Sequence, residues 1–97
     1  MIKVEIKDNL ITIKGHAGYD DKGKHIVCAS VSSIVITTIN GIIEIDNEAI
    51  DYSDLDNKIV IRIIKEDDIV NKLINNMLLL LESLEKDYND YIKIIRR

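Results

Sequence analysis

One cysteine and two histidines are the residues of this chain best suited to nucleophilic chemistry. Cys28 is the only cysteine, and His16 precedes it by twelve residues in the segment GHAGY. A thiolate attacks a carbonyl carbon, while an imidazole takes the thiol proton and later donates a proton to the leaving amine. The pair is therefore the minimum set for acyl transfer. A lone cysteine is more often a small buried hydrophobe, so residue types alone do not establish catalysis.

Other polar residues lie close to this pair in the sequence. His25 precedes Cys28 by three residues and is either a second base or an exposed histidine near a helix start. Ser32 follows one helical turn after Cys28 and either hydrogen-bonds within the site or is a small residue that permits close packing. Gly15, Gly18 and Gly23 punctuate a charged stretch between the pair, which predicts a loop over the site from 15 to 24.

The elements that position these residues begin with strands. Residues 2–7 alternate apolar and charged side chains, and 10–14 continue the pattern after Asp8-Asn9, which predicts an N-terminal hairpin. Residues 58–64 are rich in isoleucine and valine and predict a third strand. Short strands are also expected near 50–52 and 91–95.

Residues 26–45 have two interpretations. Asn40-Gly41 between isoleucine-rich runs is typical of a β-hairpin turn, whereas the apolar residues from Val27 to Ile42 recur at helical spacing. We favour one long buried helix that starts near Ile26. Cys28 would then lie in its first turn, where unpaired backbone N–H groups stabilise a thiolate and can accept the oxyanion of a tetrahedral intermediate.

A second helix is expected after the acidic run 66–68, because carboxylates are favourable at a helix start. Leu79 and Leu80 widen its apolar stripe, which indicates either a broad core face or a self-association surface. The predicted order is strand, strand, helix, strand, strand, helix, strand. This order predicts an α+β fold of two layers, with two helices on a mostly antiparallel sheet.

Composition limits the function classes. The 97 residues are expected to form a single domain over 1–97, and the net charge of −4 argues against direct DNA binding. The N-terminal residues lack the apolar run of a signal peptide, and the late run 77–81 is far shorter than a membrane span. A single cysteine cannot form an internal disulfide, so a reducing, cytoplasmic setting is expected. Asp20 and Asp21 show no metal-ligand pattern, so no metal is expected.

The motifs around the two candidate residues resemble a known family. Gly15-His16-Ala17, a short glycine-containing loop, and Ile26-Val27-Cys28-Ala29 followed by Val31-Ser32 are similar to the ribosomal-processing cysteine protease (Prp) family. The resemblance covers nearly the whole chain. It implies a homodimeric α+β endopeptidase, without metal or organic cofactor, that removes the N-terminal extension of a large-subunit ribosomal protein.

The resemblance also assigns residues. By motif position Cys28 corresponds to the nucleophile, His16 to the general base, and Ser32 to a serine of the family motif. The family usually has an aspartate immediately before Ile-Val-Cys, where this chain has His25, so the third catalytic member stays open. Two alternatives remain: a non-catalytic ribosome-associated assembly module, and a structural dimer in which Cys28 is buried and inert.

Overall fold

The computed structural model describes residues 1–15 and 22–97, with the side chains of 22–25 left out. Two strands, β1 (Ile2–Lys7) and β2 (Leu10–Lys14), form the antiparallel hairpin that the alternating pattern predicts. The turn between them places Asp8 at a φ of 53°, a left-handed conformation that aspartate tolerates better than most residues. The predicted boundaries of both strands are confirmed.

The remaining strands complete a five-stranded sheet in the order β3-β4-β2-β1-β5. β3 (Ile50–Leu55) is longer than the predicted 50–52, and it pairs with β4 (Lys58–Ile63). β5 (Ile92–Arg96) pairs with β1 in parallel, whereas every other pairing is antiparallel. The expectation of a mostly antiparallel sheet is confirmed.

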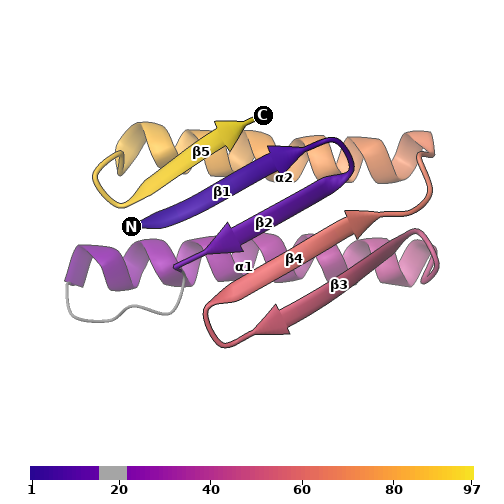
Figure 1. The fold of residues 1–97 in the computed structure, drawn as a ribbon, viewed down its shortest axis with the longest axis horizontal. Coiled ribbons are helices and arrows are strands. Elements are labelled where there is room, and N and C mark those ends of the chain that lie inside the picture. The colour runs from indigo at the N-terminus through magenta and orange to yellow at the C-terminus, as the bar shows by residue number, and fades with distance from the viewer. Residues whose placement is uncertain (16–21) are drawn as a thin grey trace.

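Two helices, α1 (Lys22–Ile45) and α2 (Asp68–Asp87), cover one face of the sheet and run side by side behind it (Figure 1). The predicted α+β class, two layers and element order are confirmed. Between the layers lies one cluster of buried apolar side chains in which isoleucine dominates. The largest fully buried members are Ile2, Ile11, Ile13, Ile39, Ile42, Ile59, Ile61, Met77, Leu81 and Ile92.

Tertiary packing decides the ambiguous segment in favour of a helix. Asn40 and Gly41 are helical, and the residues on either side of them, Ile39 and Ile42, are buried against the sheet. In a hairpin at Asn40-Gly41 these two isoleucines would be direct cross-strand partners, whereas here they lie three residues apart on the buried face of one continuous helix. The part Ile26–Ile45 has a mean hydropathy of 2.0, enough by length and composition alone for a membrane span, and here it packs on the sheet.

The chain turns sharply where α1 ends. The Asp46 carboxylate accepts hydrogen bonds from the Glu48 N–H at 3.0 Å and from Lys65 Nζ at 3.2 Å. The backbone hydrogen bond from Glu48, followed by the contact with Lys65, holds the pKa of Asp46 below its usual value. This turn directs the chain from the helix layer back to the sheet, where Ala49 and Ile50 are buried.

Helix α2 starts as predicted, with a side-chain cap. Asp67 has extended backbone angles, and its Oδ1 accepts from the Val70 N–H at 2.9 Å. The residues that α2 buries are Val70, Ile74, Met77, Leu78 and Leu81. Leu79 and Leu80 lie outside this stripe and are 63% and 46% exposed, so they are not part of the core.

Candidate active site around Cys28

Cys28 lies on the side of α1 that faces the sheet. It is 2% exposed, between Val27 and Val31 of the buried stripe, and it forms no disulfide. Its Sγ lies 4.0 Å from the carbonyl oxygen of Gly15, the residue that follows β2. The end of β2 lies beside the first part of α1 (Figure 1), and the contact of Gly15 with the thiol joins the two.

Gly15 holds the end of β2 in a backbone conformation that other residues rarely adopt. Its φ is +86°, its N–H donates to the Asn57 carbonyl at 3.1 Å, and a Cβ there would lie 2.6 Å from the Met1 carbonyl oxygen. The sequence suggested a loop glycine chosen for flexibility. The structure gives it a different role, because neither the φ nor the space accommodates a side chain.

The second member of the predicted pair lies outside the described residues. His16 belongs to 16–21, as does the predicted loop residue Gly18, so the separation of His16 from Cys28 is not described. The residue immediately before His16 is described: it is Gly15, and its carbonyl contacts the thiol.

The expected start of α1 near Ile26 is wrong. The helix begins at Lys22, so Gly23 is its second residue rather than part of a loop, and Cys28 lies in its second turn. The backbone N–H groups without an intrahelical partner are those of the first four helical residues. The N–H of Cys28 lies beyond them, and the predicted stabilisation of a thiolate and an oxyanion by first-turn amides at Cys28 does not hold.

The two accessory candidates both fall on α1. His25 belongs to the first turn, and its side chain is outside the described part. Ser32 lies one turn after Cys28 and is half-buried, so it follows the thiol on the same side of the helix. Within the described residues, no group of three His, Cys, Asp or Glu side chains is arranged to hold a metal ion.

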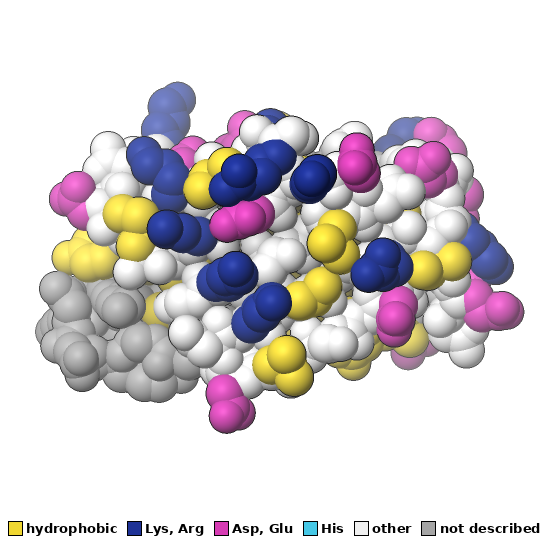
Figure 2. All heavy atoms as spheres, viewed as in Figure 1, with side chains coloured by type: hydrophobic (Ala, Val, Ile, Leu, Met, Phe, Trp, Pro, Cys, Tyr) yellow, Lys and Arg dark blue, Asp and Glu magenta, His cyan; other side chains and the backbone are white. Residues whose placement is uncertain are grey.

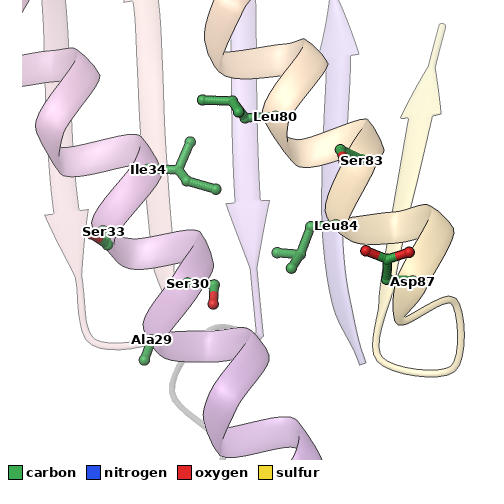
Figure 3. A pocket seen from close by; sticks show the side chains of 8 residues that line it. All are labelled: Ala29, Ser30, Ser33, Ile34, Leu80, Ser83, Leu84 and Asp87. Carbon is green, nitrogen blue, oxygen red and sulfur yellow. The ribbon is translucent and has the colours of Figure 1, made fainter.

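A groove of about 530 Å³ separates the outer sides of the two helices (Figure 3). Ile34 and Leu84 point into it from α1 and α2. The thiol faces the sheet, so this groove is a feature distinct from the surroundings of Cys28. Sequence reasoning missed the groove because its lining joins positions about fifty residues apart. It is lined by Ala29, Ser30, Ser33, Ile34, Leu80, Ser83, Leu84 and Asp87.

Comparisons with known proteins agree with this architecture. The model of the family described as cysteine protease Prp matches residues 1–93. The ribosomal processing cysteine protease Prp of Staphylococcus aureus strain Mu50 is 30% identical over 87 residues, which are 87% of this chain and 82% of that protein. The Mycoplasma genitalium protein of the same name is 38% identical over 60 residues, 62% of this chain and 56% of that protein.

Solved structures show the same fold. A crystal structure of the essential ribosomal processing protease Prp from S. aureus with a substrate peptide has a TM-score of 0.88 at 24% identity, covering 99% of this chain and 97% of that one. A second structure of that protease, with a covalently linked product peptide, has a TM-score of 0.83 at 25% identity and the same coverage. The family match over 1–93 and the full-length likeness in fold lead to one conclusion: the chain belongs to the Prp family of cysteine proteases.

Proposed function

We propose that this chain is a cysteine endopeptidase that removes the N-terminal extension of a large-subunit ribosomal protein. Cys28 is the nucleophile and His16 the general base. The observation that carries the proposal is the contact between the Cys28 thiol and the carbonyl of Gly15, the residue that immediately precedes His16. Membership of the Prp family supports it, as does the S. aureus relative with its covalently linked product peptide.

The thiol needs a base to become a nucleophile. The Sγ atom lies 4.0 Å from the Gly15 carbonyl oxygen, a position from which a thiol S–H group can donate a hydrogen bond. A thiolate has no proton to give to a carbonyl oxygen, so activation breaks this contact. Because Cys28 lies in the second turn of α1, the unpaired amides of the helix start do not take over the task. The proposed proton acceptor is therefore the imidazole of His16, the residue that follows Gly15.

The reaction then proceeds in two balanced steps. His16 takes the Sγ proton, and the sulfur attacks the scissile carbonyl carbon to form a tetrahedral intermediate. As the C–N bond breaks, the imidazolium gives its proton to the leaving amine, and an acyl-enzyme remains on Cys28. Water, deprotonated by His16, attacks the thioester carbon and releases the carboxylate product together with the thiol.

Burial of the thiol adds a requirement. Since Cys28 is 2% exposed, a peptide carbonyl reaches Sγ only after atoms around the thiol move. Substrate binding must therefore include a local rearrangement. The rate of Cys28 alkylation by iodoacetamide is expected to change when a non-cleavable substrate peptide is added, and an unchanged rate would contradict a rearrangement on binding.

Cleavage of a peptide that spans the extension junction tests the catalytic assignment. Cys28→Ala is expected to abolish turnover, and His16→Ala to lower kcat by at least about a thousandfold, as losses of nucleophile or base do in hydrolases. His25→Ala is the matched histidine control and should reduce activity without erasing it. Undiminished turnover by Cys28→Ala would overturn the proposal, and complete loss in His25→Ala with activity kept in His16→Ala would transfer the base to His25.

The burial of Cys28 also favours a second candidate, a non-catalytic ribosome-associated assembly module in which the thiol is inert. The two candidates differ in how thiol reactivity depends on pH. An activated thiol reacts with iodoacetamide well below the free-cysteine value of ~8.5, whereas an inert thiol follows that value or is protected throughout. The pH profile of alkylation in the native protein therefore separates enzyme from module.

We further propose that the protein is a homodimer that associates through the outer side of α2. Leu79 and Leu80 are exposed there, and Leu80 also lines the groove beside α1. Light scattering should show a dimer that Leu79→Lys together with Leu80→Lys converts to a monomer. Leu55→Lys, an exposed leucine on β3, is the matched control and should leave the mass unchanged. A native monomer at the concentration of the cleavage assay would contradict this.

A cytoplasmic location completes the proposal. A single cysteine suits a reducing compartment, and the apolar part of α1 packs on the sheet. Fractionation of cells that produce the chain should recover it with the soluble ribosome-containing fraction. Recovery in the membrane pellet after high-salt washing would instead indicate that the apolar segment Ile26–Ile45 inserts.

A further inference from the structure

The face of the sheet opposite the helices carries a row of four lysines. β1 and β2 pair Lys3 with Lys14, β2 and β4 pair Lys14 with Lys58, and β1 and β5 pair Lys3 with Lys93. The row therefore crosses four neighbouring strands in the order Lys58, Lys14, Lys3, Lys93. With strands about 4.8 Å apart, it spans roughly 14 Å.

All four lysines point away from the helices. Each is next in sequence to a buried residue that faces the core, and successive side chains of a strand alternate between faces. Those buried neighbours are Ile2, Ile13, Ile59 and Ile92. Figure 2 views this face and shows Lys and Arg side chains spread across it.

The row is not neutralised within the described part of the molecule. Of the ion pairs formed by residues 1–15 and 22–97, one lies on this face, between Arg97 and Glu5, and none includes a lysine of the row. Lys7 and Arg62 occupy further outward positions of the same strands. The face is thus strongly positive in a chain whose net charge is −4.

A row of like charges lowers the stability of the fold unless a partner neutralises it. Like charges directly opposite each other on adjacent strands are destabilising, and here three consecutive pairs are of this kind. A chain with more acidic than basic residues has carboxylates available to pair with the lysines, yet it places none within the row. The nearby Glu5 pairs with Arg97, and Asp51 lies opposite Arg62. The arrangement fits a partner that supplies a line of negative charge.

We infer that this lysine row is a binding surface for the phosphate backbone of RNA. A polynucleotide strand carries one negative charge per residue in a continuous line, which matches a linear row better than a broad patch. None of the outward strand positions is aromatic, so the surface contacts phosphates without stacking on bases. The choice of RNA rests on the proposed function, because ribosomal proteins assemble with ribosomal RNA.

The distribution of acidic residues determines which layer of the protein faces RNA. The net charge of the whole chain argues against a general nucleic-acid binder, but the field at one face is set by the charges on that face. Carboxylates gather in the helix layer and its connections, among them Glu44, Asp68, Glu82 and Asp87. The protein therefore meets RNA with the sheet, and the helix layer faces away.

The test measures binding of a short mixed-sequence RNA duplex to the Cys28→Ala protein, so that cleavage plays no part. Replacing Lys3, Lys14 and Lys58 by Gln should weaken binding at least tenfold. It should also reduce the slope of log K against log salt concentration by about 2 to 3. Replacing Lys65, Lys72 and Lys86 by Gln is the matched control, with the same change in net charge away from the sheet face, and should leave most of the affinity.

Loss of folded protein should not account for a lower RNA affinity of the row variant. Removal of the repulsion should leave its thermal midpoint at or above that of the parent. Equal losses in both triple variants would show a general charge effect and overturn the inference. No RNA binding, or binding only to vesicles of phosphatidylserine and phosphatidylcholine, would overturn it as well. Peptide cleavage by the native protein is scored separately, so failure of this inference and failure of the proposed function are distinguishable.

Discussion

The two helices pack on the same face of the sheet but begin in different ways. α2 begins with Asp67, whose carboxylate caps the first turn, and Asp68 adds a favourable charge there. α1 begins at Lys22, and its first turn contains Gly23 and no acidic residue. The start of α2 could be located from its acidic residues, whereas the first turn of α1 offers no comparable signal.

This difference has consequences for the site. The one-turn error in the start of α1 moved Cys28 from the first turn to the second and removed the helix-start amides from its chemistry. No comparable error affects α2, which supplies core residues and an exposed leucine pair. The helix that carries Cys28 is thus the one whose first turn gives the weaker signal of where it begins.

The largest expected effects test whether the helices contribute equally to the core. Ile39→Ala in α1 and Leu81→Ala in α2 each remove a fully buried side chain and should lower the free energy of unfolding by about 2–5 kcal/mol. Leu79→Ala, at an exposed position of α2, is the control and should change it by less than about 0.5 kcal/mol. Urea denaturation measures all three, and a small loss for Ile39→Ala alone would show that α1 is the weaker partner.

Gly15→Ala tests the segment that leads into α1. A φ of +86° and a Cβ 2.6 Å from the Met1 carbonyl oxygen should cost about 1–3 kcal/mol of stability. Because the Gly15 carbonyl contacts Cys28, peptide cleavage should fall further than the loss of folded protein explains. Normal activity at temperatures where the variant is fully folded would show that the strained end of β2 does not position the site.

Asp67→Ala tests the capped start of α2. Loss of the hydrogen bond to the Val70 N–H should lower the free energy of unfolding by about 1 kcal/mol. Asp68→Ala is the control: it removes an exposed ion pair with Lys72, worth only about 0.2–0.5 kcal/mol. If chemical denaturation shows equal effects, dipole interaction rather than capping sets the start of α2.

Gly41→Ala should stabilise the protein, and it tests the segment that resembles a hairpin. The residue is helical, and a Cβ there meets nothing within 4 Å. Alanine in a helix interior is favoured over glycine by roughly 0.5–1 kcal/mol. A rise of that size in the free energy of unfolding is expected, and a loss would contradict a helical Gly41.

The strands are the part of the fold that the sequence predicts best. Alternation located β1 and β2 to the residue because each has one buried and one exposed face. The length of β3 was underestimated because five of its six residues are exposed and leave no alternating pattern. Helical spacing identified α1, but the hairpin alternative is excluded only by the structure, in which Asn40 and Gly41 are helical and the segment packs on the sheet.

The candidate site likewise has residues that the sequence predicts and features that it does not. Cys28 and Gly15 could be singled out by residue type and motif, and the structure brings them together. The steric role of Gly15 could not be foreseen, because it depends on Met1, which is close in space and distant in sequence. The lysine row is invisible in the sequence for the same reason: it exists only once strand order and register are known.

The parallel pairing of β1 with β5 has a consequence for how the chain folds during synthesis. Ile2 pairs with Ile92, far later in the chain, so one edge of β1 stays unpaired until β5 has been made. An open strand edge invites pairing with other chains, and contacts between distant residues slow folding. The nascent chain can form its β1–β2 hairpin early, but the sheet closes only when β5 leaves the ribosomal tunnel. While its edge is unpaired, β1 carries the charged side chains of Lys3, Glu5 and Lys7. Charged side chains are one means by which natural sheets discourage aggregation at an edge.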